Sequence, residues 1–287
     1  MQLTIRVAKS AGFCFGVSRA VGMVEGMLDR GERVCTLGPV IHNPRLVAEL
    51  GARGAAVVDM PEQVPPGTAA VIRSHGVPRE TYDRLRDAGV RVADATCPFV
   101  AKIHRIVADP AYEAVLIAGD PRHPEVEGIR GHCAVPSFVF SDRRELRQIL
   151  AEHPALRTQK LAVVAQTTFH AELWTECSEF LKKVYTNAII FDTICSATSV
   201  RQREAKELAS ESDFMVIVGG RQSSNTRKLY TVCAEICPSA LVEGADELPL
   251  GKLRRAGRIG VTAGASTPAR IIKEVLNTMS GLDNDNN

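Results

Sequence analysis

The sequence predicts an α/β fold of three pseudo-threefold-related lobes with mainly parallel sheets. Two observations support this prediction. Short apolar runs typical of buried strands alternate with amphipathic helical stretches along the whole chain, which is the pattern of parallel sheets flanked by helices. Three segments also repeat the same order of strand, short turn, cysteine and helix, and such self-similarity indicates repeated lobes. A chain of 287 residues suits several small lobes better than one compact core.

Strands are expected where apolar, β-branched residues stand together between turn residues. These runs are 3–8, 69–72, 114–118, 161–165, 188–192, 214–218 and 258–262. Helices are expected between them, because apolar residues recur there at helical spacing. After the first cysteine, for example, Val17, Ala20, Val21 and Val24 fall on one helix face.

The three repeated segments are KSAGFCFGVSRAV, VADATCPFVAKI and FDTICSATSVRQ, with Cys14, Cys97 and Cys195 at equivalent places. Each cysteine is expected at the carboxyl end of a strand and the start of a helix, where ligands gather in α/β proteins. The helix dipole at that position favours the thiolate form that metals bind. The three cysteines are therefore predicted to form one metal-cluster site.

Polar motifs follow each cysteine at matching distances. His42 and His75 stand 28 and 61 residues after Cys14, and His123 and Thr167 stand 26 and 70 after Cys97. Ser223 and Ser266 stand 28 and 71 residues after Cys195. We expect lobes at 1–95, 96–192 and 193–287, each of which contributes one cysteine and two polar loops to a shared centre.

The residues alone leave the metal open. Three converging thiolates suit an iron–sulfur cluster, although four cysteine ligands are more common. Zinc competes, but structural zinc sites usually take cysteines paired two to four residues apart. A single cysteine is most often a small buried apolar residue, and this is the expectation for Cys233 and Cys237, which lie four apart on one helix face.

The polar loops predict an anion site. Small hydroxyl, amide and imidazole side chains beside helix starts donate many hydrogen bonds to a phosphate group. Asn43 before Pro44 and Thr267 before Pro268 also suit helix N-caps, and any one such loop can be only a cap. The candidate anion-binding residues are His42, His75, Ser223, Ser224, Asn225 and Ser266.

The segment HPEVEG offers His123, Glu125 and Glu127. If side chains alternate there, Glu125 shares a face with His123 while Val126 turns away. Enclosure raises the pKa of a carboxyl group, so Glu125 is a candidate proton donor, whereas Glu127 is expected to be structural. Thr167, directly after a strand, is a candidate for orienting a substrate hydroxyl, with a cap or turn as the alternative.

Composition excludes several classes of function. A formal net charge of +2 is too small to indicate a nucleic-acid or membrane partner. The N-terminus lacks the apolar core of a signal peptide, and no run reaches the about 20 apolar residues of a membrane span. We expect a cytoplasmic protein with a disordered tail at 281–287. Its eight cysteines then favour metal ligation or catalysis over disulfides.

Taken together, the motifs GFCFGV, IHN, SHGV, DATCP, HPEVEG, QTT, TIC-x-AT-x-x-RQ, SSN and TAGAS resemble the 4-hydroxy-3-methylbut-2-enyl diphosphate reductase family, from about residue 3 to residue 280. The resemblance implies three lobes around a central [4Fe–4S] cluster bound by Cys14, Cys97 and Cys195, with one open iron. It implies a diphosphate pocket formed by the six candidate residues above with His123 beside them. It also implies proton delivery by Glu125 and positioning of substrate by Thr167.

The reaction implied by the resemblance is a two-electron, two-proton reductive removal of an allylic hydroxyl, which yields isopentenyl and dimethylallyl diphosphates. This is the last step of the methylerythritol phosphate route to isoprenoids. The implied electron donor is ferredoxin or flavodoxin, and the expected state is a monomer or weak dimer. Two other hypotheses are an iron–sulfur electron carrier, which gives no reason for a diphosphate pocket, and a zinc-dependent hydrolase of phosphorylated substrates.

Overall fold

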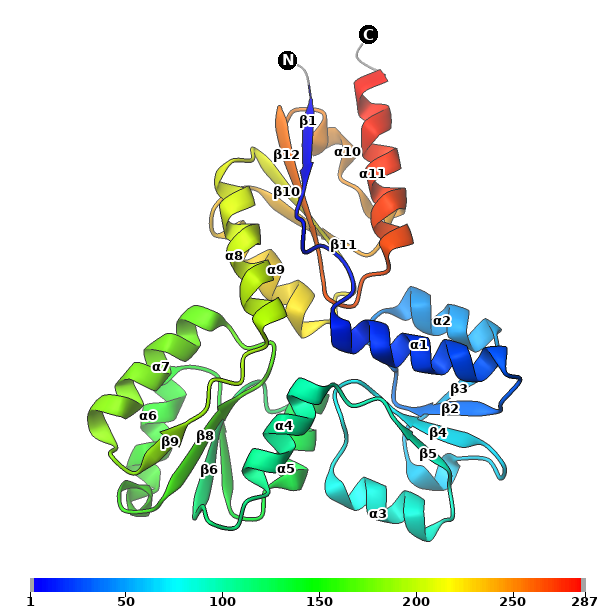
Figure 1. Cartoon of the computed structure of the whole chain (residues 1–287). Coiled ribbons are helices and arrows are strands. Elements are labelled where there is room, and N and C mark those ends of the chain that lie inside the picture. The colour runs from blue at the N-terminus through cyan, green and yellow to red at the C-terminus, as the bar shows by residue number, and fades with distance from the viewer. Residues whose placement is uncertain (1–2, 285–287) are drawn as a thin grey trace. The chain divides into compact units, whose positions relative to one another are not determined.

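The computed structural model describes residues 3–284 and contains three four-stranded parallel sheets within that range (Figure 1). By its contacts the chain divides into two compact units. Unit 1 comprises residues 1–18, 41–49 and 196–287, and unit 2 comprises residues 19–40 and 50–195. Within the described residues no helix is long and apolar enough to cross a membrane.

The sheet of unit 1 has the order β1-β12-β10-β11. Its strands are β1 (Thr4–Val7), β10 (Phe214–Val218), β11 (Ser239–Val242) and β12 (Arg258–Ala263). One face packs against α10 (Leu250–Leu253) and α11 (Ala269–Asn284) through an apolar cluster that includes Val261 and Ile271. The other face packs against α8 (Ser196–Ser210) and α9 (Ser224–Ala234) (Figure 1). A short 3-10 helix, η3, spans Ala245–Glu247.

The first sheet of unit 2 has the order β3-β2-β4-β5. Its strands are β2 (Val34–Leu37), β3 (Ala55–Val58), β4 (Ala69–Ile72) and β5 (Val92–Asp94). One face packs against α3 (Arg79–Asp87), whose Leu85 is fully buried. Helices α1 (Phe15–Asp29) and α2 (Pro44–Ala52) precede β2 and β3, and the 3-10 helix η1 spans Pro61–Gln63.

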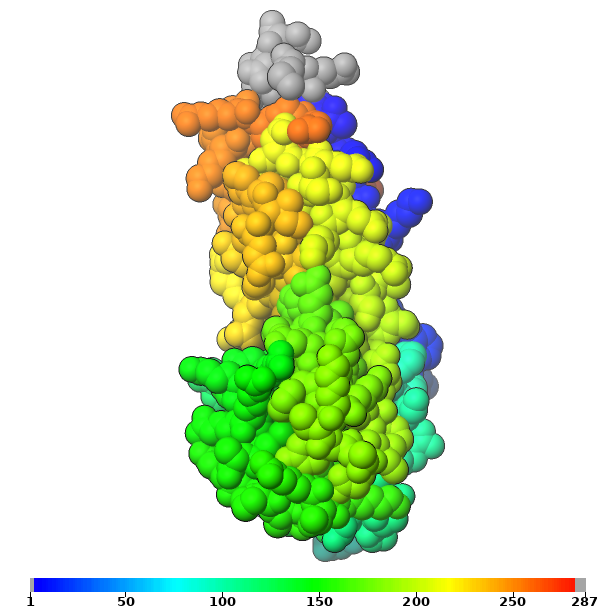
Figure 2. All heavy atoms as spheres, turned by 90° about the vertical axis from the view of Figure 1, so that its left-hand side faces the viewer, coloured from blue at the N-terminus to red at the C-terminus, as the bar shows by residue number. Residues whose placement is uncertain are grey.

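The second sheet of unit 2 has the order β7-β6-β8-β9. Its strands are β6 (Ala114–Ala118), β7 (Ser137–Phe140), β8 (Leu161–Ala165) and β9 (Ala188–Ile190). Helices α4 (Pro98–Val107) and α5 (Pro124–His132) cover one face. Helices α6 (Arg143–Glu152) and α7 (Ala171–Val184) cover the other, with the 3-10 helix η2 (Pro154–Arg157) beside them. Figure 2 shows the lobe from the side of α6 and α7, in green.

The three sheets share one topology, which confirms that the chain has three α/β lobes. The topology also shows which strand completes each sheet. Each has its first strand second in the order, flanked by its second and third strands, with a fourth strand at the edge. In the sheet of unit 1 that fourth place is taken by β1, which pairs with β12 in parallel. This differs from the expected first lobe of 1–95, because the third sheet recruits its edge strand from the N-terminus.

The expected strands occur within two residues of their predicted bounds. They are found because completely buried parallel strands such as β6, β8 and β10 read as continuous apolar runs. The predicted disordered tail is wrong for residues 281–284, which continue helix α11 to Asn284. Residues 285–287 lie outside the described residues.

Candidate active site

In unit 1, three loops meet at the carboxyl ends of β10 and β12. Ser223 is the N-cap of α9, and its hydroxyl accepts a hydrogen bond from the Thr226 N–H at 3.3 Å. The Asn43 side chain caps α2 by accepting from the Leu46 N–H at 3.1 Å, and its amide donates to the Ser266 carbonyl at 3.1 Å. The loops of Asn43 and Ser266 are thereby joined, as the anion-site prediction requires.

The backbone of His42 completes this junction. Its carbonyl accepts a hydrogen bond from the Ser266 hydroxyl at 3.3 Å. A Cβ placed on Gly220 would lie 2.6 Å from the same carbonyl oxygen, so only glycine allows the loop before α9 to approach this closely. Residues of the predicted first and third lobes therefore lie together within unit 1.

Asn225 stands out among the buried polar residues of unit 1. It is 4% exposed, and neither polar atom of its side-chain amide has a hydrogen-bond partner among the described residues. An unsatisfied buried amide is costly, so such a group in a native fold requires an explanation. At the N-terminal turn of α9, where backbone N–H groups are also unsatisfied by the helix, the Asn225 side-chain N–H2 group and these backbone groups are donors of the kind that bind an anion.

The Cys14 loop is held by helix α8. The Glu204 carboxylate accepts hydrogen bonds from the Lys9 N–H at 2.6 Å, the Ser10 N–H at 2.9 Å and the Ser10 hydroxyl. Arg201 donates to the Gly12 carbonyl at 2.7 Å. Burial alone raises the pKa of Glu204, but the hydrogen bonds from Ser10 and Lys9 outweigh it and lower that pKa. Arg201 belongs to the motif that begins at Thr193, whereas Glu204 was not indicated by any sequence pattern.

In unit 2, His123 and Glu125 lie at the start of α5. His123 is the N-cap, and its Nδ1 accepts a hydrogen bond from the Glu125 N–H at 3.1 Å. A neutral His123 therefore carries its proton on Nε2. The alternating conformation expected for HPEVEG is wrong, because Pro124 begins a helix here; Val126 still turns away and is fully buried in the core beneath α5.

Glu125 and Thr167 form a bidentate pair. One carboxylate oxygen of Glu125 accepts from the Thr167 N–H at 2.6 Å, and the other accepts from the Thr167 hydroxyl at 2.8 Å. Both side chains are buried, Glu125 at 2% exposure and Thr167 at 7%. A carboxylate and a hydroxyl at this distance can exchange a proton. Glu127, two residues on, is exposed on α5 and does not belong to this pair.

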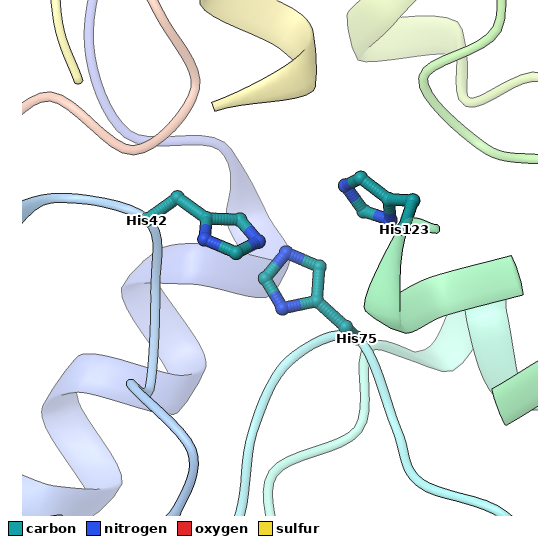
Figure 3. Close-up of side chains that lie close together, drawn as sticks. All are labelled: His42, His75 and His123. Carbon is teal, nitrogen blue, oxygen red and sulfur yellow. The ribbon is translucent and has the colours of Figure 1, made fainter. Parts of the chain in front are cut away.

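His75 lies beside His123 in unit 2. The ring centroids are 5.4 Å apart and the rings are nearly perpendicular, at 78°. Both side chains are labelled in Figure 3. The backbone of the same loop holds the second cysteine, because the Cys97 N–H donates to the Ser74 carbonyl at 3.0 Å. The Cys195 N–H likewise donates to the Thr167 carbonyl at 3.0 Å. Two cysteines of the repeat are thus bonded to loops that carry candidate site residues.

The eight cysteines divide by environment. Cys14, Cys97 and Cys195 are partly exposed and immediately precede α1, α4 and α8. By contrast, burial raises the pKa of Cys133 and Cys177 to about 11 and that of Cys233 to about 12. The core packing predicted for Cys233 and Cys237 is confirmed, since both lie in or against the apolar cluster beneath α8 and α9.

Thr267 lies in the loop between β12 and α11. Its hydroxyl donates to the Val218 carbonyl at 2.9 Å and so ties the loop after β12 to strand β10. Sequence reasoning also gave no role to His132 or Gly131, whose contacts depend on chain segments distant in sequence.

The fold and these loops define a class: a three-sheet α/β protein with polar loops and partly exposed cysteines at the carboxyl ends of its strands. Comparison with known proteins narrows the class. The family model described as LytB protein matches residues 5–280. The 4-hydroxy-3-methylbut-2-enyl diphosphate reductase of Clostridioides difficile (strain 630) is 39% identical over 98% of this chain and 100% of that protein. The protein of the same name from Alkaliphilus oremlandii (strain OhILAs) is 40% identical, with 98% and 100% covered.

Two solved structures are similar over nearly the whole chain. The E-1-hydroxy-2-methyl-but-2-enyl-4-diphosphate reductase from Plasmodium falciparum has a TM-score of 0.88 at 25% identity and covers 96% of this chain and 88% of that one. A structure of (E)-4-hydroxy-3-methyl-but-2-enyl diphosphate reductase, described as the terminal enzyme of the non-mevalonate pathway, has a TM-score of 0.69 at 37% identity, with 98% and 100% covered. The chain belongs to the LytB protein family.

Proposed function

We propose that this chain is a 4-hydroxy-3-methylbut-2-enyl diphosphate reductase, the last enzyme of the methylerythritol phosphate route. The match to relatives of that name over 98% of the chain is the observation that carries the proposal. In the reaction the allylic C–O bond breaks and the hydroxyl leaves as water with one proton. Two electrons and a second proton are added to the allyl group, which gives isopentenyl or dimethylallyl diphosphate.

We assign Cys14, Cys97 and Cys195 as ligands of one [4Fe–4S] cluster with one open iron. The donor set fits, because these are partly exposed cysteines at helix starts, where the dipole favours thiolate. When bound, the cluster would supply the electrons and a Lewis-acidic iron. The buried thiols Cys35, Cys177 and Cys233 have raised pKa values and are poor ligands by comparison.

The substrate diphosphate is assigned to the polar loops. Ser223, Ser224 and Asn225 offer hydroxyl, amide and backbone donors at the start of α9, and the unsatisfied side-chain N–H2 group of Asn225 supports this assignment most directly. Ser266, His42 and His75 are assigned to the same ligand. Hydrogen bonds from many groups fix the substrate's short carbon chain, so that proximity contributes to the rate.

Glu125, Thr167 and His123 are assigned to proton delivery and substrate orientation. A proton on Glu125 can pass to the Thr167 oxygen across the 2.8 Å hydrogen bond, while the Thr167 hydroxyl passes its own proton onward. Burial of both residues excludes bulk water from this step. His123 orients Glu125 through the hydrogen bond from the Glu125 N–H to Nδ1.

The remaining assignments follow the family. Ferredoxin or flavodoxin is the proposed electron donor, the proposed location is the cytoplasm, and the proposed state is a monomer or weak dimer. No nucleic-acid or membrane partner is proposed, in keeping with the formal net charge of +2.

The test is anaerobic purification followed by reduction of the diphosphate substrate with dithionite. We expect a brown protein with broad absorbance near about 400 nm and conversion to the two products. A colourless, zinc-loaded protein that stays active would overturn the cluster assignment. A brown protein without turnover would favour the electron-carrier hypothesis.

Glu125→Gln separates the proton-delivery assignment from binding. The amide keeps the size of the side chain but cannot hold an acidic proton, so turnover is expected to fall by about 10²-fold or more, while the cluster spectrum stays unchanged. Glu127→Gln, at the exposed carboxylate two residues on, is the matched control and is expected to retain activity. Unchanged turnover in Glu125→Gln contradicts the assignment.

A further inference from the structure

The loop that carries His75 is packed without spare room against α4. Gly76 has φ +71°, and a Cβ at this position would lie 2.6 Å from Cε1 of His104 and 3.3 Å from Cγ2 of Thr96. Glycine is required here both for the left-handed backbone and for the close approach of the His104 ring. The His75 loop is therefore shaped by a residue of the helix that Cys97 caps.

Helix α5 closes the other side of the same loop. A Cβ on Gly131 would lie 2.4 Å from Cβ and 2.7 Å from Cα of Pro78. One turn earlier, a Cβ on Gly128 would be in ordinary contact, 3.6 Å from the His75 carbonyl oxygen. Residues 75–78 thus pack against the backbone of α5, the helix that His123 caps and that carries Glu125.

Two stacked imidazoles, one from α4 and one from α5, also contact the loop of residues 75–78; we call the packing of α4 and α5 around this loop the clamp. His104 of α4 and His132 of α5 lie 4.0 Å apart between ring centroids, with only 14° between their planes. Nε2 of His132 lies 3.1 Å from the Val77 carbonyl oxygen and must donate, because a carbonyl only accepts. Burial lowers the pKa of both rings, that of His104 to about 3, so the pair is neutral at physiological pH and stacks without charge repulsion.

We propose that His132, held in place by its stack on His104, is a positioning residue that fixes the backbone of residues 75–78 and thereby the imidazole of His75. The hydrogen bond to Val77 anchors the loop two residues after His75. The same helix supplies His123, whose ring lies 5.4 Å from that of His75, so the clamp sets the two imidazoles relative to each other. The inference rests on the proposed function in that His75 is taken to bind the diphosphate.

The test compares His132→Ala, which removes the hydrogen bond and the stack, with His132→Gln, whose amide nitrogen can replace Nε2 as the donor to Val77. Gly131→Ala places a Cβ on α5 too close to Pro78 and so disturbs the packing of the loop against this helix. Gly22→Ala is the matched control, because a Cβ on this helical glycine meets nothing within 4 Å. Hydrogen exchange of the backbone amides of residues 74–77, inorganic diphosphate affinity, KM and kcat are measured on the cluster-containing protein.

Loss of one positioning hydrogen bond is expected to raise KM and the dissociation constant for inorganic diphosphate about fivefold in His132→Ala, with kcat changed less than about twofold. Exchange of the amides of residues 74–77 should accelerate in His132→Ala and Gly131→Ala, while His132→Gln and Gly22→Ala stay near wild type. Wild-type loop exchange and diphosphate affinity in His132→Ala would overturn the proposal. If Gly131→Ala fails to fold, the two His132 variants decide alone.

Failure of the proposed function gives a different result. A wild-type protein that neither binds inorganic diphosphate nor turns over the substrate contradicts that function, whereas the amide exchange rates of residues 74–77 still decide whether His132 anchors the loop.

Discussion

The buried His104 ring makes the folded protein sensitive to mild acid. Its side chain is 5% exposed, and burial, followed by the neighbouring His132, lowers its pKa from 6.5 to about 3. Below about pH 6.5 the unfolded chain binds a proton at this position and the folded chain does not. The stabilisation is therefore complete above that pH and is lost as the pH falls.

The magnitude follows from the two pKa values. With 6.5 in the unfolded chain and about 3 in the folded chain, only the unfolded state titrates between about pH 7.5 and pH 5.5. Linkage then removes about 1.4 kcal/mol of unfolding free energy over this interval. Carboxylates contribute little there, because their ordinary pKa values lie near about 4.

The assay is anaerobic urea unfolding of the wild type and of His104→Gln at both pH values. Glutamine does not titrate, so the difference in unfolding free energy between the two proteins should shrink by about 1.4 kcal/mol at the lower pH. The absolute cost of the substitution does not matter to this comparison. A difference that stays constant within about 0.3 kcal/mol would refute the assignment of a neutral, buried His104.

Three further predictions concern the candidate site. Glu204→Ala removes three hydrogen bonds to the loop before Cys14 and should lower the unfolding free energy by about 1–2 kcal/mol. The variant should also lose its cluster to chelators faster, measured as loss of the cluster absorbance; equal rates of loss in variant and wild type would contradict this. Asn225→Ala removes an unsatisfied buried amide, so thermal unfolding should be unchanged or shifted upward while the dissociation constant for inorganic diphosphate rises about tenfold or more; a large loss of stability with normal binding would argue for a structural role. In cluster-free protein, mass spectrometry after brief alkylation should find the partly exposed Cys14, Cys97 and Cys195 modified before the buried Cys177 and Cys233, and preferential labelling of the buried pair would oppose the ligand assignment.

Local patterns in the sequence accounted for much of the fold. The strands were evident because buried parallel strands are continuous apolar runs, and the capping roles of Asn43 and Ser223 follow from the same few residues. The repeated offsets from the three cysteines correctly predicted three lobes of one topology. The helical start at His123 was missed, because a single proline had to be weighed against the apparent alternation of HPEVEG.

Pairing between distant segments could not be obtained in this way. Strand β1 is the fourth strand of the sheet that contains β10, β11 and β12. This pairing depends on which sheet edge remains open, and the four residues of an edge strand do not indicate which strand they pair with. The sequence also does not predict the contact of Glu204 with the loop of Cys14, because a half-exposed glutamate on a helix has the pattern of an ordinary surface residue.

The sequence by itself determined the chemistry that this protein has available. It has three cysteines at helix starts, small polar loops after strands, and the carboxyl group of Glu125 and the hydroxyl group of Thr167 in two separate loops. Only the tertiary structure decided how that chemistry is held. It joined Glu125 to Thr167 by two hydrogen bonds and set His75 on the backbone of α5. The physical reason is that composition and spacing act along the chain, whereas orientation comes from backbone contacts between segments tens of residues apart.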